Sequence, residues 1–182
     1  MEQNRYKWEL IELLRKGEGH QRALGRQIGV NHMTVSRTLR ALQQENIADC
    51  RREGKNTVYL LKDSAEAKIA VRMCEYAKLT HTIHRYPRLR RIIEELAHNP
   101  TISLAVLFGS YAKGIATASS DIDLFIATKD RTVKENMRQL DSKLSIKIGQ
   151  LSARDPLSRE IAENHIILKG VDAYYDRAEL SP

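Results

Sequence analysis

Cysteines and long apolar runs are both scarce in this sequence. The two cysteines in 182 residues, Cys50 and Cys74, are too few for a disulfide framework, and their spacing matches no zinc motif. We therefore expect plain buried thiols. No apolar stretch approaches the roughly 20 residues that a membrane span needs, and the polar start over residues 1–8 does not resemble a signal peptide. These absences predict a soluble, cytoplasmic protein that does not enter membranes.

The charge is basic overall and unevenly spread. A composition of 42% apolar and 29% charged residues is typical of a globular chain, and the length suits two small domains. Residues 1–62 hold 12 Lys/Arg and 7 Asp/Glu, a net charge of +5, whereas residues 101–182 hold 11 of each. A basic first third is expected where a chain meets a polyanion. Solvated lysines would give the same sum, so charge alone leaves both interpretations open.

The first third shows a helical spacing of apolar residues followed by two β-prone runs. The spacing predicts helices over residues 6–16, about 21–27 and 32–44. Gly29-Val30-Asn31 predicts a tight turn before the third helix, because glycine accepts a left-handed backbone and asparagine can cap a helix. Residues 47–50 and 56–61 predict a hairpin around a basic loop. The polar face of the third helix presents His32, Thr34, Ser36, Arg37 and Arg40.

Over about residues 5–62, this pattern resembles the winged helix-turn-helix family of transcription regulators. The resemblance implies that the third helix, with its polar face, enters the major groove of double-stranded DNA. It also implies that the tip of the hairpin touches the DNA backbone or the minor groove through Arg51, Arg52 and Lys55. A three-helix unit that makes only protein contacts is the alternative, and the basic charge favours DNA.

Residues 63–86 predict a helix that links two domains. Apolar residues recur there at helical spacing, and Ser64 is a suitable N-cap. The apolar stripe consists of Ile69, Met73, Tyr76 and Ile83. It either faces a second copy of the chain in a homodimer or covers the chain's own second domain, which we expect over residues 87–182, beginning with a shorter helix over 88–98.

The second domain opens with an apolar strand that ends in a glycine. Residues 102–108 predict a buried strand, which stops at Gly109-Ser110. A second strand begins at Asp121, so the carboxylates of Asp121 and Asp123 project from one face. Two such carboxylates repel each other unless a cation lies between them, and Mg²⁺ prefers oxygen ligands. With the glycine-serine turn as an anion cradle, this pattern indicates a site for a nucleoside triphosphate and its metal.

The stretch Gly109-Ser110-x-Ala112-x-Gly114, followed by Ser120-Asp121-x-Asp123-Leu124, resembles the polymerase-beta-type nucleotidyltransferase superfamily. Within it, the minimal nucleotidyltransferase domain is the nearest likeness, over roughly residues 88–175. The resemblance implies that Asp121 and Asp123 are catalytic and hold Mg²⁺, and that Gly109, Ser110 and Lys113 bind the nucleotide. It further implies transfer of a nucleoside monophosphate to a hydroxyl of a protein or RNA acceptor.

One feature departs from the superfamily. Its active members carry a third carboxylate on the next central strand, which we expect here over residues 144–151, after a helix over 132–143. The face opposite the apolar residues of that strand offers Ser145, Lys147 and Gly149, none of them acidic. The sequence therefore supports two functions: a DNA-binding nucleotidyltransferase, or a transcriptional regulator whose second domain has lost transfer and senses a nucleotide or binds a partner. One half of a toxin–antitoxin pair is a third.

The fold class expected from these patterns is α+β. We predict an N-terminal winged helix-turn-helix followed by a small mixed-sheet nucleotidyltransferase-fold domain.

Overall fold

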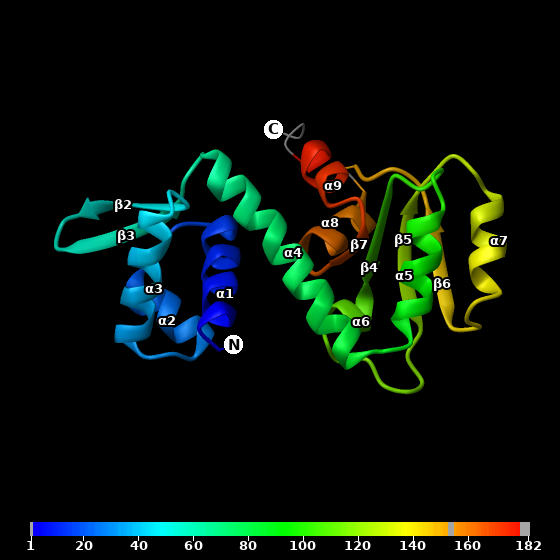
Figure 1. Cartoon of the computed structure of the whole chain (residues 1–182), viewed down its shortest axis with the longest axis horizontal. Coiled ribbons are helices and arrows are strands. Elements are labelled where there is room, and N and C mark those ends of the chain that lie inside the picture. The colour runs from blue at the N-terminus through cyan, green and yellow to red at the C-terminus, as the bar shows by residue number, and fades with distance from the viewer. Residues whose placement is uncertain (1, 153–154, 179–182) are drawn as a thin grey trace. The chain divides into compact units, whose positions relative to one another are not determined.

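A computed structural model of the chain describes residues 2–152 and 155–178 (Figure 1). It divides into two compact units, residues 1–77 and 78–182. The division falls inside helix α4 (Ala65–Arg85), which occupies most of the segment expected to link the domains. Among the described residues, no helix combines the length and the apolar character needed to cross a bilayer.

The first unit contains three helices and a small antiparallel sheet. Its elements are α1 (Glu2–Lys16), β1 (Gly19–His20), α2 (Gln21–Ile28), α3 (His32–Gln44), β2 (Ala48–Glu53) and β3 (Asn56–Leu61). Helix α3 has the predicted bounds. It begins where expected because the Asn31 Oδ1 atom accepts a hydrogen bond of 2.9 Å from the Thr34 amide, and Gly29 takes the left-handed backbone with φ of 69°.

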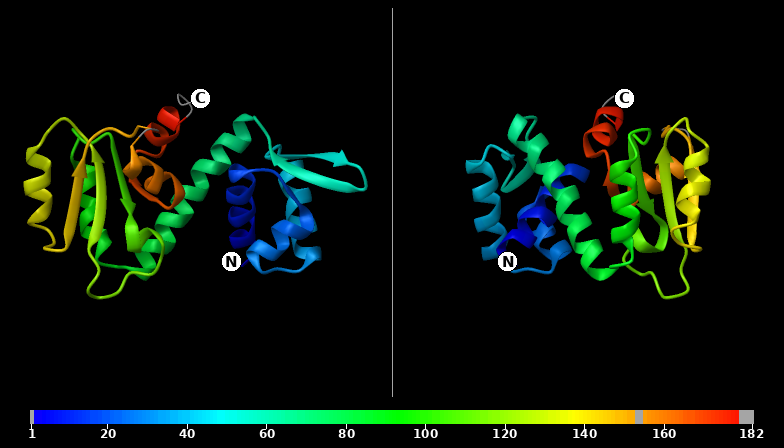
Figure 2. Two further views of the ribbon diagram at one scale, coloured as in Figure 1. Left: turned by 180° about the vertical axis from the view of Figure 1, so that it is seen from behind. Right: turned by 45° about the vertical axis from the view of Figure 1, so that its right-hand side comes forward.

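The helices of this unit enclose an apolar core, and the hairpin projects beyond them (Figure 2). Leu10, Ile11, Leu39 and Leu42 have no exposed surface. The sheet order is β1-β3-β2, so the two-residue strand β1 pairs with β3 on the side opposite β2. Strand β1 was not predicted, because two residues carry no periodicity. A helix-turn-helix followed by this sheet is a winged helix-turn-helix.

Helix α4 turns its small residues inward and part of its large apolar stripe outward. Ala67, Ala70 and Cys74 are buried, whereas Ile69, Met73 and Tyr76 are 59%, 49% and 56% exposed. Ile83, the fourth residue of the stripe, is half-buried. The expectation of two buried thiols was wrong for Cys50, which lies exposed on the outer strand of the hairpin.

The second unit is built on a four-stranded mixed sheet in the order β6-β5-β4-β7. Strand β5 is parallel to β6 and antiparallel to β4, and β4 is antiparallel to β7. The elements are α5 (Leu89–His98), β4 (Leu104–Phe108), α6 (Gly109–Ala112), β5 (Ile122–Ala127), α7 (Thr132–Arg138), β6 (Leu144–Ile148), α8 (Pro156–Glu163), β7 (Ile166–Lys169) and α9 (Val171–Ala178). Both the α+β class and the mixed sheet agree with the prediction.

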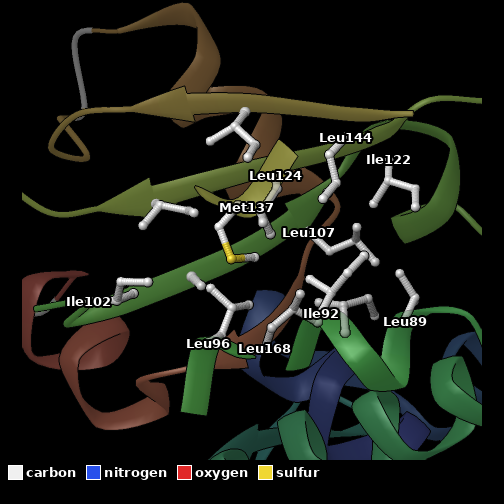
Figure 3. Packing of buried hydrophobic residues seen from close by; sticks show 14 of the residues in the cluster. Leu89, Ile92, Leu96, Ile102, Leu107, Ile122, Leu124, Met137, Leu144 and Leu168 are labelled. Atoms are coloured by element: carbon white, nitrogen blue, oxygen red, sulfur yellow. The ribbon is translucent and has the colours of Figure 1, made fainter. Parts of the chain in front are cut away.

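The core of this unit lies between α5 and one face of the sheet. Figure 3 shows Ile92 and Leu96 of α5 directed toward Leu107 and Leu124 of the central strands. Helix α5 is strongly two-sided, so its buried leucines and isoleucines fall on one face while its arginines and glutamates remain exposed. This packing fixes the sheet whose β4 and β5 strands carry the site residues.

Lys169, at the end of β7, closes the C-terminal end of α5. Its Nζ atom donates hydrogen bonds of 2.7 Å to the carbonyl oxygens of both Leu96 and Asn99. The last carbonyls of a helix have no partner within the helix, and a cation there also interacts favourably with the helix dipole. Lys169 is therefore structural.

Helix α7 is shorter than expected. The predicted helix over residues 132–143 ends at Arg138, and residues 139–143 form turns. Asp141 in this turn forms an ion pair of 2.5 Å with Arg88 and accepts a bond of 3.0 Å from the Lys143 amide. Burial by itself would raise the pKa of Asp141, but these partners outweigh it and lower the pKa. These bonds hold residues 139–143 in turns, so the helix ends before them.

Candidate nucleotide site and DNA-binding surface

The turn after β4 brings Gly109 against the carboxylate of Asp123. Phe108 and Asp123 are register partners in the antiparallel pair β4–β5, so Gly109, the next residue, lies beside Asp123. Gly109 has φ of 66°, and a Cβ atom placed on it would collide with Asp123 Oδ2. Both the backbone angle and the lack of space require glycine here. The following helix, α6, which carries Ser110, has only four residues.

The two aspartates lie at the start of β5. Asp123 is half-buried within the strand, and Asp121 is exposed in the position just before it. Burial raises the pKa of Asp123, and the negative charges of Asp121 and Glu160 raise it further, against a hydrogen bond from Ser145 and the charge of Lys147. The pair of aspartates is therefore mutually repulsive, which is the condition under which a cation binds with advantage.

Strand β6 carries a serine beside Asp123. The parallel pairing of β5 with β6 makes Ser145 the register partner of Asp123 and Lys147 the partner of Phe125. Ser145 is half-buried and Lys147 is exposed, while Leu144 and Ile146 are buried on the opposite face. The strand ends at Ile148 rather than at residue 151. Its polar face is therefore the one expected from the sequence, and it carries no acid.

Glu160 on α8 is a carboxylate near this site that the sequence analysis missed. It forms an ion pair of 3.7 Å with Lys113, which the sequence analysis assigned to the nucleotide. The negative charge of Glu160 also raises the pKa of Asp123. No local pattern marks Glu160, because α8 is far from the aspartates in the sequence and comes near them only through the fold. Among the described residues, no three His, Cys, Asp or Glu side chains are close enough to enclose a metal ion.

The polar face of α3 has the residues and exposure expected of a recognition helix. His32, Arg37 and Arg40 are exposed, and Thr34 and Ser36 are half-buried. Met33, which was not among the predicted contacts, is 76% exposed at the start of this helix. A methionine so exposed among polar neighbours is a signal that the sequence alone did not give, because helical spacing does not distinguish it from the polar residues on either side.

Helix α2 adds two arginines beside this face. A hollow of about 750 Å³ lies between α2 and the start of α3. It is lined by Gln21, Arg22, Gly25, Arg26, Gly29, Val30 and His32. No DNA contact was predicted for α2, although the helix that precedes a recognition helix crosses the DNA backbone in this motif.

The three basic residues of the hairpin differ in their surroundings. The Arg51 guanidinium forms ion pairs of 2.6 Å with Glu18 and 2.9 Å with Glu53, and the bond to Glu18 raises its pKa. No described carboxylate pairs with Arg52 or Lys55. Arg51 is thus neutralised by its neighbours, whereas the other two present uncompensated positive charge.

The second unit matches the model of a known protein family. Residues 90–171 match the family model described as polymerase beta, nucleotidyltransferase. The second unit is a nucleotidyltransferase-fold domain. Gly109, Ser110, Lys113, Asp121, Asp123, Ser145 and Glu160 all lie within the matched segment of this nucleotidyltransferase-fold domain.

Solved structures with similarity to the chain cover mainly the other unit. One is the transcriptional repressor BigR from Xylella fastidiosa, with 29% identity over 36% of this chain and 64% of that one, and a TM-score of 0.34. Another is the homodimeric winged helix-turn-helix DNA-binding domain of a possible ArsR-family transcriptional regulator from Mycobacterium bovis, with 25% identity over 44% and 71% and a TM-score of 0.36. A third is the adhesin competence repressor AdcR from Streptococcus pyogenes, with 14% identity over 48% and 65% and a TM-score of 0.39. The chain thus spans less than two thirds of BigR and of AdcR. No curated protein matches it.

Proposed function

We propose that this chain is a DNA-binding protein whose nucleotidyltransferase-fold domain transfers a nucleoside monophosphate from a nucleoside triphosphate to an acceptor hydroxyl. The observation that carries the proposal is the contact of the half-buried Asp123 carboxylate with the Gly109 turn, with Asp121 close enough to raise its pKa. A fold that only needed a turn there has no reason to hold a half-buried carboxylate against it with a second carboxylate nearby.

The donor set suits Mg²⁺. Asp121 and Asp123 would hold the ion, because carboxylate oxygens are the ligands that hard divalent cations prefer and because the desolvated Asp123 gains most from a compensating charge. When bound, Mg²⁺ neutralises charge on the triphosphate oxygens. The Gly109 backbone and the Ser110 hydroxyl would face the phosphates, and Lys113 would add positive charge.

Glu160 is the residue we assign to the acceptor proton. Strand β6 supplies no acid beside Asp123, whereas the Glu160 carboxylate acts on Asp123 from α8 and pairs with Lys113. A carboxylate within reach of the attacking hydroxyl accelerates transfer by accepting its proton. Binding of a triphosphate would draw Lys113 toward the phosphates and release Glu160 for this role.

Labelled transfer tests the proposal directly. The full chain is incubated with Mg²⁺, α-labelled nucleoside triphosphates and candidate protein or RNA acceptors, and label on the acceptor is measured. Asp121→Asn/Asp123→Asn is expected to abolish transfer. Glu160→Gln is expected to lower it about a hundredfold, whereas Glu163→Gln, at an exposed position on the same helix, should leave it unchanged. Transfer that survives the double aspartate substitution would overturn the proposal.

The second candidate function is regulation without nucleotidyl transfer, and Ser145 favours it. Active members of the superfamily carry an acid on this strand, whereas here the residue beside Asp123 is a serine. In that case the domain binds a nucleoside triphosphate, or a protein partner such as the other half of a toxin–antitoxin pair, and only regulates the DNA-binding unit. The two functions separate in one experiment: nucleotide binding without transfer to any acceptor identifies the regulator.

The winged helix-turn-helix unit is proposed to bind double-stranded DNA. The polar face of α3, with His32, Thr34, Ser36, Arg37 and Arg40, would enter the major groove. Arg22 and Arg26 of α2 and Arg52 and Lys55 of the hairpin would contact phosphates. Binding of a labelled duplex to the full chain at 50 mM and 200 mM salt tests this. A phosphate-based interface loses much of its affinity over that range, and a salt-independent one would contradict it.

The exposed stripe on α4 supports a homodimer. Ile69, Met73 and Tyr76 follow one another at helical spacing and are all about half exposed or more, and winged regulators commonly read paired half-sites as dimers. We expect sedimentation to show a dimer that Met73→Lys dissociates, whereas Lys68→Gln on the same helix does not. A monomer at micromolar concentration would contradict this assignment.

A further inference from the structure

The carboxyl ends of the two parallel strands in the second unit border a basic hollow. It has a volume of about 550 Å³ and is lined by Thr128, Lys129, Arg131, Lys134, Ile148 and Gly149. Thr128 follows the last residue of β5, and Ile148 ends β6. The hollow therefore lies at the C-terminal ends of these strands, whereas the aspartates lie at the start of β5. Five strand positions separate Asp123 from Thr128, which at about 3.3 Å each is roughly 17 Å. The hollow is therefore outside the proposed metal–triphosphate site.

The lining of this hollow is positively charged. Lys129, Arg131 and Lys134 contribute three cations, and no described carboxylate pairs with any of them. The nearest acid in the sequence, Asp130, is not among the lining residues. Its Oδ1 atom accepts hydrogen bonds of 2.9 Å from the Thr132 amide and 2.7 Å from the Thr132 hydroxyl, and these bonds lower its pKa. The lining thus holds three cations and no acid, an excess of positive charge that attracts a multiply charged anion.

Shape and position agree with a small ligand. A volume of this size falls within the range of pockets that hold nucleotide-sized molecules. Gly149 adds no side chain to the lining, and Ile148 adds an apolar surface beside the cations. The hollow is small and half-open, which favours a small polyphosphate over a duplex.

We propose that this hollow binds an anion with two or more adjacent phosphates, such as a nucleoside diphosphate or triphosphate, at a site separate from the aspartate pair. The phosphates would lie among Lys129, Arg131 and Lys134, and the Thr128 hydroxyl would donate to one of them. The site is independent of nucleotidyl transfer, because none of its residues contacts Asp121 or Asp123.

Titration of the full chain with tripolyphosphate in EDTA tests the proposal without metal. Calorimetry should give saturable binding that Lys129→Gln/Arg131→Gln/Lys134→Gln weakens at least tenfold. The matched variant Arg90→Gln/Arg91→Gln/Arg138→Gln removes three exposed cations elsewhere in the unit and should change affinity less than twofold. Equal losses in both variants, or none in the first, would overturn the proposal.

Two further measurements keep the result clear of misfolding and of the active site. In the wild-type chain, tripolyphosphate should shift the amide signals of Thr128 and Gly149, and their constancy would overturn the proposal with no variant needed. Asp121→Asn/Asp123→Asn should bind tripolyphosphate normally in EDTA, so failure of the transfer assay and failure here are distinct. ATP should compete at similar affinity, and displacement by single-stranded RNA but not by ATP would show that the occupant is a nucleic acid and refute the assignment.

Discussion

Alanine at Gly109 tests whether the turn exists to hold the Asp123 carboxylate. Gly109 and Gly114 provide a matched pair, because their φ values are 66° and 70°. At Gly114 the nearest atom to an added Cβ is 3.6 Å away on Arg85, whereas at Gly109 the added Cβ would collide with Asp123. Gly114→Ala should therefore cost only the left-handed backbone energy of about 1–2 kcal/mol. Gly109→Ala adds overpacking, for a total loss of about 2–5 kcal/mol.

The extra cost should depend on the carboxylate. Asp123→Ala removes the atom that collides, so Gly109→Ala introduced into that variant should cost no more than Gly114→Ala. Urea unfolding followed by circular dichroism measures each free energy of unfolding, and amide signals of β4 and β5 assign the transition to the second unit. Equal costs at the two glycines, or an unchanged cost in the Asp123→Ala background, would refute the contact on which the proposed site depends.

Four other outcomes are expected. The folded-state pKa of Asp123 is raised above its ordinary value of 3.8. Its contribution to stability is therefore greatest below pH 3.8 and is lost as pH rises through the folded-state pKa. Urea midpoints should show this loss, and Asp123→Asn should remove it. Mg²⁺ with a nucleoside triphosphate at a hundredfold excess over the dissociation constant should stabilise the chain by about 2.7 kcal/mol in thermal melts, an increment that Asp121→Asn/Asp123→Asn eliminates without destabilising the ligand-free protein. Arg52→Ala should weaken DNA binding at every sequence and reduce the salt slope by about 0.9, whereas Arg51→Ala should do less because two glutamates already neutralise Arg51; equal effects in filter binding would contradict this. Lys169→Met should cost about 1.5–3 kcal/mol in urea unfolding, and a neutral result would show that the helix carbonyls find water instead.

Local patterns were sufficient for much of this fold. The bounds of α3 followed from its apolar spacing and from Asn31, whose capping bond depends only on residues next to it. The turn at Gly109 and the strand after Asp121 followed in the same way, although the strand begins one residue later, at Ile122. Where a short stretch of chain determines its own backbone, the sequence is enough.

Features that arise from contacts between distant segments were beyond the sequence. Ile69 and Met73 share a helical spacing with buried residues elsewhere, but only the fold shows that α4 packs through its alanines. No local pattern marks the roles of Lys169 and Glu160, since their partners lie on helices or turns far away in the chain. The compensation of Arg51 by Glu18 belongs to the same class. Periodicity shows which residues share a face of a helix or strand, but it does not show which residues they contact.

The two carboxylates of the candidate site differ in how firmly their backbone is held. Asp123 lies on a strand that is paired on both sides, with Phe108 and with Ser145, so its position is fixed before any ligand arrives. Asp121 ends a loop that is held by a bond of 2.9 Å from the Thr117 amide to the Ser120 hydroxyl and by a bond from Lys143 to the Ala118 carbonyl. Ordering a free loop costs about 1–2 kcal/mol for each residue. These bonds restrict the backbone before Asp121 in advance of any ligand, and they are made by polar residues of the loop that are not among the proposed ligands.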